Sequence, residues 1–182
     1  MSMHTPPPAA PSVSQVRAAP SALSRFTQLQ VVIGESVIAA SAATLSALVF
    51  EVPVWAMFVG WIAFFTRGLN LKQGAINLAC VLIGVLLAIA AVQAMPLLGA
   101  HLGPYAISAL VFGVTVIVLS LARAPVFNNL LGFFLGLVAY FASHQPPSMA
   151  TFGMLALAAT TGAIAAFLAH ALQKRLQRGA AH

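Results

Sequence analysis

All eight Lys and Arg residues of this chain lie in alternate connectors of a sequence that contains six apolar stretches. They precede the first stretch, separate the second from the third and the fourth from the fifth, and follow the last. These cations are Arg17, Arg25, Arg67, Lys72, Arg123, Lys174, Arg175 and Arg178. Because cytoplasmic loops of multipass membrane proteins retain Lys and Arg, the pattern predicts a multipass membrane protein with both termini cytoplasmic.

The apolar stretches predict an all-α integral membrane protein with six transmembrane helices. A helix needs about 20 residues to cross a hydrocarbon core of about 30 Å. The second and fifth stretches are shorter than this, and each begins near a proline, Pro53 or Pro125, which the first turn of a helix tolerates. The predicted spans are Val31–Phe50, Val52–Thr66, Gly74–Met95, Tyr105–Leu121, Pro125–Phe141 and Met149–Leu172.

The composition supports a surface that faces the lipid bilayer. The chain is 61% apolar and 5% charged, whereas soluble domains carry about 25% charged residues. Its net charge of +6 would suggest nucleic acid in a soluble protein, but here the cations flank spans and suit anionic headgroups. No basic stripe with interleaved aromatic residues is present, so we expect no nucleic-acid partner.

The composition of both ends of the chain predicts tails outside the spans. Residues 1–28 are rich in Pro, Ala and Ser and contain no apolar core of a signal peptide, which predicts a disordered cytoplasmic tail. Residues 174–182 contain three cations and predict a basic cytoplasmic tail.

The region between the tails divides into two three-helix repeats, 29–100 and 101–173. When the second repeat is aligned on the first without gaps, Pro53 meets Pro125 and Gly60 meets Gly132, and Trp61 meets Phe133. Since each repeat has an odd number of spans, the second must be inverted relative to the first. Inverted repeats are typical of transporters and channels. An old duplication that left a symmetric scaffold without a pore is the alternative.

The stretch from Val52 to Ala88 combines an aromatic helix, a glycine-containing turn and a further glycine on the next helix. Its marking residues are Trp55, Gly60, Trp61, Phe65, Gly68, Leu69, Lys72, Gly74 and Gly84, and the second half adds Pro125, Gly132 and Gly136. This pattern resembles the bacterial inner-membrane family of domain of unknown function 1097, over about residues 31–172. Arg67 and Asn70 depart from the small residues of the family's turn. The resemblance has implications for the fold and for a location in the bacterial inner membrane. It assigns no activity to the chain, because none is assigned to the family.

Glu35 is the one acidic residue within a predicted span. An unpaired carboxylate in a membrane costs several kcal/mol, so such a residue is a functional candidate. One interpretation is a carboxyl group that binds solute or couples protons. The other is an interfacial glutamate that pairs with Arg67, Lys72 or Arg123 and locks two helices together.

Three asparagines lie near predicted helix starts at the cytoplasmic side. Asn77 begins the third predicted helix, and Asn128 and Asn129 begin the fifth. Helix starts expose N–H donors, so these residues are candidates for an inner solute mouth. The alternative is that Asn128 and Asn129 only cap the helix.

Aromatic and small residues complete the candidate set. Trp55, Trp61 and Phe133 could shape a solute path, although aromatic belts at the membrane interface are the ordinary explanation. Glycines allow helix backbones to approach closely, either within one chain or in a homo-oligomer. The glycines assigned to helix packing are Gly60, Gly84, Gly132, Gly136 and Gly162.

The sequence contains no pattern typical of a cofactor site, a metal site or an enzyme. No spacing of His, Cys and carboxylates suits a metal ion, and no phosphate-binding or nucleophile motif is present. We therefore expect a channel or simple transporter for a small neutral or weakly charged solute. The rival expectation is a membrane scaffold or partner subunit that transports nothing.

Overall fold

The computed structural model describes residues 25–179, and every regular element in this range is helical. The elements are α1 (Arg25–Leu48), α2 (Val54–Phe65), α3 (Leu71–Leu102), the single 3-10 turn η1 (Gly103–Tyr105), α4 (Ala106–Leu121), α5 (Leu130–Ser143) and α6 (Met149–Gly179). The predicted all-α class is confirmed for this range.

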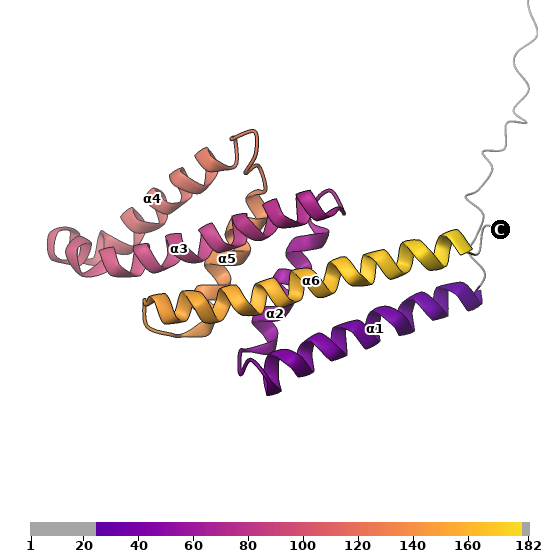
Figure 1. Ribbon diagram of the computed structural model, residues 1–182. Coiled ribbons are helices and arrows are strands. Elements are labelled where there is room, and N and C mark those ends of the chain that lie inside the picture. The colour runs from indigo at the N-terminus through magenta and orange to yellow at the C-terminus, as the bar shows by residue number, and fades with distance from the viewer. Residues whose placement is uncertain (1–24, 180–182) are drawn as a thin grey trace, which may run out of the picture.

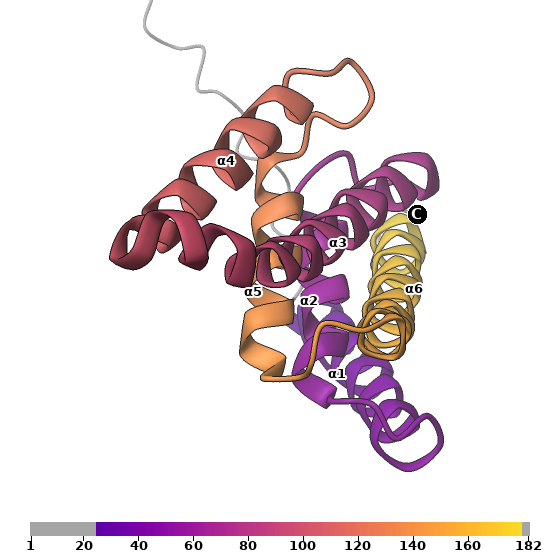
Figure 2. The same ribbon diagram turned by 90° about the vertical axis from the view of Figure 1, so that its left-hand side faces the viewer.

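Two short helices cross a set of longer ones. The helix α1 lies beside α6, and α4 lies beside α3, whereas α2 and α5 run steeply across them (Figures 1 and 2). The most extensive contacts are those of α2 with α6 and of α3 with α5. Each short helix therefore packs mainly against a long helix from the other half of the chain.

Glycines bring α2 against α6. A methyl group added to Gly60 on α2 would overlap the carbonyl oxygen of Ala159, and one added to Gly162 on α6 would overlap that of Met57. The two backbones are therefore in direct contact, because no side chain stands between them at these positions.

The pair of α3 and α5 is built in the same way. A methyl group on Gly84 would overlap the carbonyl oxygen of Phe133, and one on Gly136 would overlap that of Val81. On Gly132 the added carbon would lie 2.9 Å from the Cβ atom of Cys80. The five glycines assigned to packing from the sequence thus all lie where two helices approach closely.

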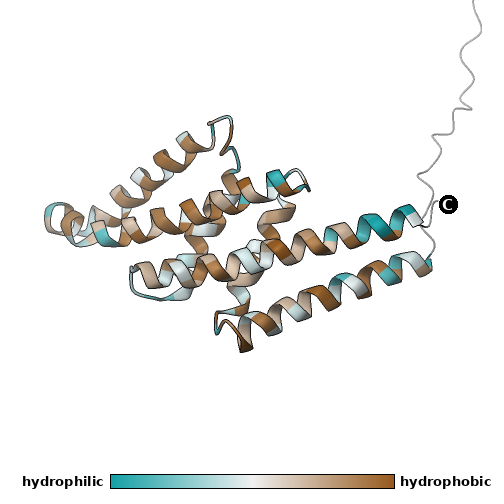
Figure 3. Ribbon diagram, in the orientation of Figure 1, coloured by the Kyte–Doolittle hydropathy of each residue, from teal (hydrophilic) through white to brown (hydrophobic). Residues whose placement is uncertain are grey.

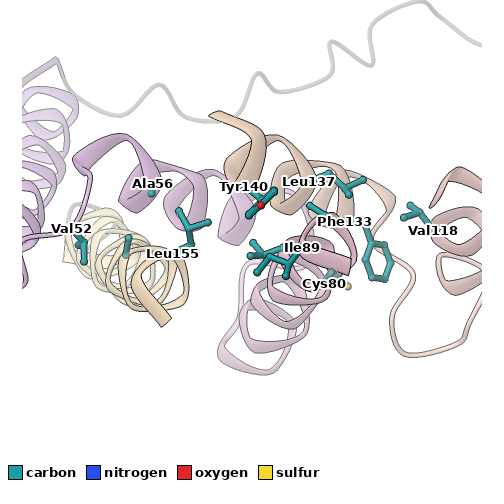
Figure 4. Packing of buried hydrophobic residues seen from close by; sticks show 12 residues of the cluster. Val52, Ala56, Cys80, Ile89, Val118, Phe133, Leu137, Tyr140 and Leu155 are labelled. Carbon is teal, nitrogen blue, oxygen red and sulfur yellow. The ribbon is translucent and has the colours of Figure 1, made fainter. Parts of the chain in front are cut away.

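The main apolar core follows these crossings. Phe133 and Cys80 are fully buried between α3 and α5, and Val118 reaches the same core from α4, while Ala56 and Leu155 lie at the crossing of α2 with α6 (Figure 4). Burial of such apolar surface contributes roughly 25 cal/mol per Å² in water. Within a bilayer, close packing takes over that role.

The outer surface of the helices is apolar. Large residues such as Phe112, at 72% exposed, and Leu48, at 75%, cover it, and the helices are mostly brown in Figure 3, with teal at the start of α3 and the end of α6. Three helical stretches are long and apolar enough to cross a membrane, namely Arg25–Leu48, Leu71–Leu121 and Met149–Gly179. An exposed surface of this kind indicates a membrane protein.

The fifth helix begins later than predicted. Pro125 does not start it, because residues 122–129 form a loop and Asn129 caps a helix that begins at Leu130. The helix α5 therefore has 14 residues, and α2, with Pro53 at its N-cap, has 12. At 1.5 Å per residue these helices are about 21 and 18 Å long, too short to cross a hydrocarbon core of about 30 Å along its normal.

Three helices extend beyond their predicted bounds, because hydropathy detects only the apolar part of a helix. Residues 25–28, assigned to the N-terminal tail, already belong to α1, and residues 174–179 of the basic tail belong to α6, whose last turn suits cations. The helix α3 begins at Leu71 and continues through Pro96 to Leu102. The predicted tail at residues 1–24 and residues 180–182 lie outside the described range.

Candidate functional site

A cluster of polar side chains joins the turn between α2 and α3 to the start of α5. We call it the amide cluster, and it comprises Thr66, Arg67, Asn77, Asn128 and Asn129. Its members come from the two halves of the chain, so the cluster links those halves across 52–63 residues of sequence.

Asn129 is the centre of the amide cluster. Its Nδ2 atom donates to Thr66 Oγ1 at 2.7 Å and to Asn77 Oδ1 at 2.9 Å. Its Oδ1 atom accepts from the backbone N–H of Gly132 at 3.1 Å, which caps the start of α5. The side chain is 5% exposed. Because both N–H groups of its side-chain amide are bonded, Asn129 fixes the start of α5 against the α2–α3 turn.

Asn77 holds the other side of the contact. It is fully buried, accepts from Asn129, and donates through Nδ2 to the backbone carbonyl of Arg67 at 2.9 Å. Gln73 also donates to Asn77 Oδ1, at 3.4 Å. Asn77 lies in the second turn of α3, because α3 begins at Leu71 and is capped by Asn70. The sequence predicted that Asn77 begins this helix, and that prediction is wrong.

Arg67 forms the exposed edge of the amide cluster. Its guanidinium donates to the side-chain oxygen of Asn128 and, at 3.2 Å, to the Asn128 carbonyl. Asn128 is half-buried and precedes the N-cap of α5. A guanidinium thus stands at the surface of a group of buried amides, where it can attract a polar or weakly anionic solute.

These helices and the amide cluster lie within a segment that matches a known family. Residues 32–170 match the family described as "Protein of unknown function (DUF1097)". The chain belongs to this family. The resemblance read from Trp55, Gly60 and the following turn is therefore confirmed. No curated protein and no solved structure matches the chain.

Glu35 lies apart from the amide cluster in this DUF1097 protein. It is half-buried on α1, which packs against α6 and α2, and no hydrogen bond of the cluster reaches α1. The neighbouring Gly34 approaches the side chain of Leu172 on α6. Glu35 thus stands near the contact of α1 with the C-terminal part of α6, while Arg67, one of its predicted partners, binds Asn128.

The three aromatic candidates do not line one space. Trp55 is 40% exposed on the outer side of α2, and Phe133 is fully buried between α3 and α5. Trp61 is half-buried and packs with Ala42, Met57 and Ala165, where α1, α2 and α6 meet. Of the three, only Trp61 faces the meeting point of α1, α2 and α6.

Sequence reasoning missed Thr66 and gave other roles to Arg67, Ser46 and His170. Thr66 and Arg67 belong to the amide cluster, but their partners lie 61–63 residues away and no local pattern marks these contacts. Ser46, expected to join neighbouring helices or to wet a pore, and His170, expected at the membrane interface, are buried polar residues on α1 and α6. Their helical periodicity resembles that of their apolar neighbours. Among residues 25–179, no group of three His, Cys, Asp or Glu residues could hold a metal ion.

Proposed function

We propose that this protein passes a small neutral or weakly charged solute across the bacterial inner membrane, as a channel or simple carrier. The observation that carries the proposal is the pair of short crossing helices, α2 and α5, each packed by glycines against a long helix of the other half. Short helices in corresponding positions of inverted repeats mark the solute site in many transporters.

The directions of the helices support an inverted repeat. The helices of the first half run opposite to their counterparts in the second (Figure 1). This holds for α1 and α4, for α2 and α5, and for α3 and α6. Opposite directions in corresponding helices are what an inverted pair of three-helix units requires.

Matching glycine contacts support the same symmetry. On the short helices, Gly60 of α2 meets the Ala159 carbonyl on α6, and Gly136 of α5 meets the Val81 carbonyl on α3. Each glycine of a short helix thus contacts a backbone carbonyl of the long helix that it crosses. The two crossings correspond when α2 is aligned with α5 and α3 with α6.

The glycines of the long helices repeat this correspondence. Gly162 of α6 meets the Met57 carbonyl on α2, and Gly84 of α3 meets the Phe133 carbonyl on α5. Both crossings therefore consist of a glycine on each helix against a carbonyl on the other. A common origin of the two halves accounts for such paired contacts.

The helix caps support the alignment of α3 with α6. Asn70 accepts from the N–H of Gln73 at the start of α3, and Ser148 accepts from the N–H of Thr151 at the start of α6. The ungapped sequence alignment paired Gly60 with Gly132. The contacts instead favour Gly136, one helical turn further along α5.

The hydrogen bonds of Arg67 support the proposed orientation. Arg67 and Lys72 flank the α2–α3 turn, and Arg123 lies in the α4–α5 loop. Since Arg67 binds Asn128 of that loop, the two cation-bearing connectors are neighbours. Both termini on the cytoplasmic side are consistent with this arrangement, with α2 and α5 as two of the six predicted spans that cross only part of the hydrocarbon core. The amide cluster would then lie at the cytoplasmic mouth.

A non-transporting scaffold or partner subunit is the second candidate. The observation that favours it is the internal bonding of the amide cluster, in which both N–H groups of the Asn129 amide are bonded within the protein. A satisfied buried network stabilises one arrangement of helices. In a scaffold, loops and exposed helix faces would carry the function, and a homo-oligomer would suit the apolar surface.

Solute flux through the purified protein in liposomes tests the proposal. Stopped-flow light scattering would follow gradients of urea, ammonium and glycerol, with empty liposomes as the reference. Glu35→Gln and Asn128→Leu would test the inner mouth, and Gly113→Ala, at an open position on α4, would serve as the matched control. Selective flux that the first two variants alter and the control keeps supports transport. Flux equal to that of empty liposomes for all solutes contradicts it and favours the scaffold.

A further inference from the structure

Two buried polar groups have no hydrogen-bond partner within residues 25–179. They are the Ser46 hydroxyl, which is fully buried, and the His170 ring, which is 9% exposed and has both nitrogens unbonded. Burial of such a group without a partner is unfavourable, because the group loses its hydrogen bonds to water. Groups of this kind need a partner from outside this range, and water or a solute would suit them.

Ser46 differs from the other hydroxyls of its helix. Ser36, Ser41 and Thr44 each donate to the carbonyl four residues earlier, at 2.8–2.9 Å. Serine hydroxyls in membrane helices commonly form this hydrogen bond to their own helix. The hydroxyl of Ser46 forms no such bond. It is therefore available to a molecule that enters the structure.

His170 is surrounded by aromatic rings. Its ring centroid lies 6.1 Å from that of Phe64 and 6.5 Å from that of Phe65. A neutral imidazole offers one donor and one acceptor, and Phe rings offer neither. The site therefore suits a small molecule that forms one or two hydrogen bonds and tolerates apolar walls.

Both groups lie along one contact region, which we call the α1–α2–α6 seam. Ser46 is next to the start of α2, since its carbonyl accepts from the N–H of Val52 at 2.9 Å. His170 contacts Phe64 and Phe65, the last two residues of α2. The two groups are therefore separated by about the length of α2, roughly 18 Å for 12 residues.

A groove borders the seam, and the helix on its outer side is loosely covered. This mostly apolar groove of about 480 Å³ lies between α1 and α6, where Ser41 and Ala165 are among its lining residues, and Ser46 and His170 do not line it. Of the three candidate membrane spans, α1 is the least covered, with 17% of its apolar window buried against 44% for the others. Small displacements of α1 would widen the seam past Trp61 and Met57.

We infer that the solute path follows the α1–α2–α6 seam, with Ser46 and His170 as the polar groups that contact a small neutral solute. The inference rests on the proposed function and adds its route and its contact residues. The amide cluster stays at the edge of the cytoplasmic mouth, where it also locks the two halves together. Glu35, near the contact of Gly34 with Leu172, would stand at the cytoplasmic end of the seam.

Chemical modification in liposomes tests the inference without a flux assay. A small neutral methanethiosulfonate would probe the Ser46→Cys thiol, and diethyl pyrocarbonate would probe His170 in the unaltered protein, each read by peptide mass mapping. The native Cys80, fully buried on α3 outside the seam, is the internal control for thiols. The exposed His144 is the positive control for histidines.

If water enters the seam, the Ser46→Cys thiol reacts at least about tenfold faster than Cys80, because thiolates form only where water reaches. His170 is then modified, and millimolar concentrations of a transported solute slow both reactions. Unreactive Ser46→Cys and His170 beside a reactive His144 overturn the inference, and so does reaction at only one of the two. A reactive seam without flux would instead contradict the proposed function, and flux without a reactive seam would contradict only the route.

Discussion

At the residue scale, buried amides do most to define how the two halves of this protein meet. Asn129 bonds Thr66 and Asn77 from the first half and caps α5 in the second. The sequence marked Asn77, Asn128 and Asn129 as polar residues at one membrane depth, and the structure places them in one cluster. It did not mark Thr66, and it favoured helix packing over a pore for Ser46, because a hydroxyl in an apolar helix usually bonds its own backbone or a neighbouring helix.

Asn129→Leu should lower the free energy of unfolding by about 2–4 kcal/mol. The change removes the helix cap on the Gly132 N–H, worth about 1 kcal/mol, and leaves the buried Asn77 oxygen short of a partner, at about 1–3 kcal/mol. Thermal unfolding in detergent, followed by the fluorescence of Trp55 and Trp61, measures the effect.

Asn128→Leu is the matched variant for this measurement. Asn128 is half-buried, and Arg67 keeps its bond to the Asn128 carbonyl, so we expect a loss of about 1 kcal/mol or less. Equal losses in the two variants would show that Asn129 is not the centre of the cluster.

At the element scale, capping residues determine where the short helices begin, and glycines determine where they cross the long helices. Hydropathy alone placed the start of the fifth helix at Pro125, but Asn129 caps a helix that begins at Leu130. A capping side chain needs a bonded N–H three residues later, which a hydropathy profile does not contain. The positions of the packing glycines, in contrast, were readable, because small residues recur on one helix face.

Gly60→Ala and Gly136→Ala should each destabilise the fold by about 3 kcal/mol or prevent folding. The added methyl groups would overlap the backbone of Ala159 or of Val81, and a backbone cannot give way as a side chain can. Midpoints of thermal unfolding and the yield of monodisperse protein in detergent would report the loss.

Gly113→Ala and Gly153→Ala are the controls for that prediction. Both glycines lie within helices and have nothing within 4 Å of an added methyl group. We expect a gain of about 0.5–1 kcal/mol, because alanine favours a helix over glycine. If all four variants behaved alike, the close crossings of α2 with α6 and of α5 with α3 would be refuted.

At the scale of the whole molecule, we propose two halves with opposite orientations. The sequence indicated the repeat through the order of long and short spans and the alternating cations. Its register differed by one helical turn from that of the contacts, because few identities anchor an alignment of apolar helices. Gly60 corresponds to Gly136 because each contacts a backbone carbonyl of the long helix that it crosses, that of Ala159 or that of Val81. A single sequence does not contain these contacts.

Reversing the charge bias should disturb the orientation of the whole molecule. Moving cations from the α2–α3 turn to the opposite side, by Arg67→Gln and Lys72→Gln together with Gln145→Arg, should lower the yield of correctly inserted protein, because Lys and Arg hold loops in the cytoplasm. Protease accessibility of a C-terminal tag measures insertion. An unchanged yield and orientation would show that the cations do not set the topology.

Thiol labelling of connectors and helix ends in intact cells tests the inverted arrangement most directly. Single cysteines at Ala100 and Gln145, and at Leu71 and Val126, all exposed positions, would be treated with a membrane-impermeant maleimide, with the buried Cys80 as an unreactive background. We predict that Ala100→Cys and Gln145→Cys are labelled from outside and that Leu71→Cys and Val126→Cys react only after the membrane is opened. Labelling of Leu71→Cys from outside, or protection of Gln145→Cys, would contradict the arrangement of two inverted halves.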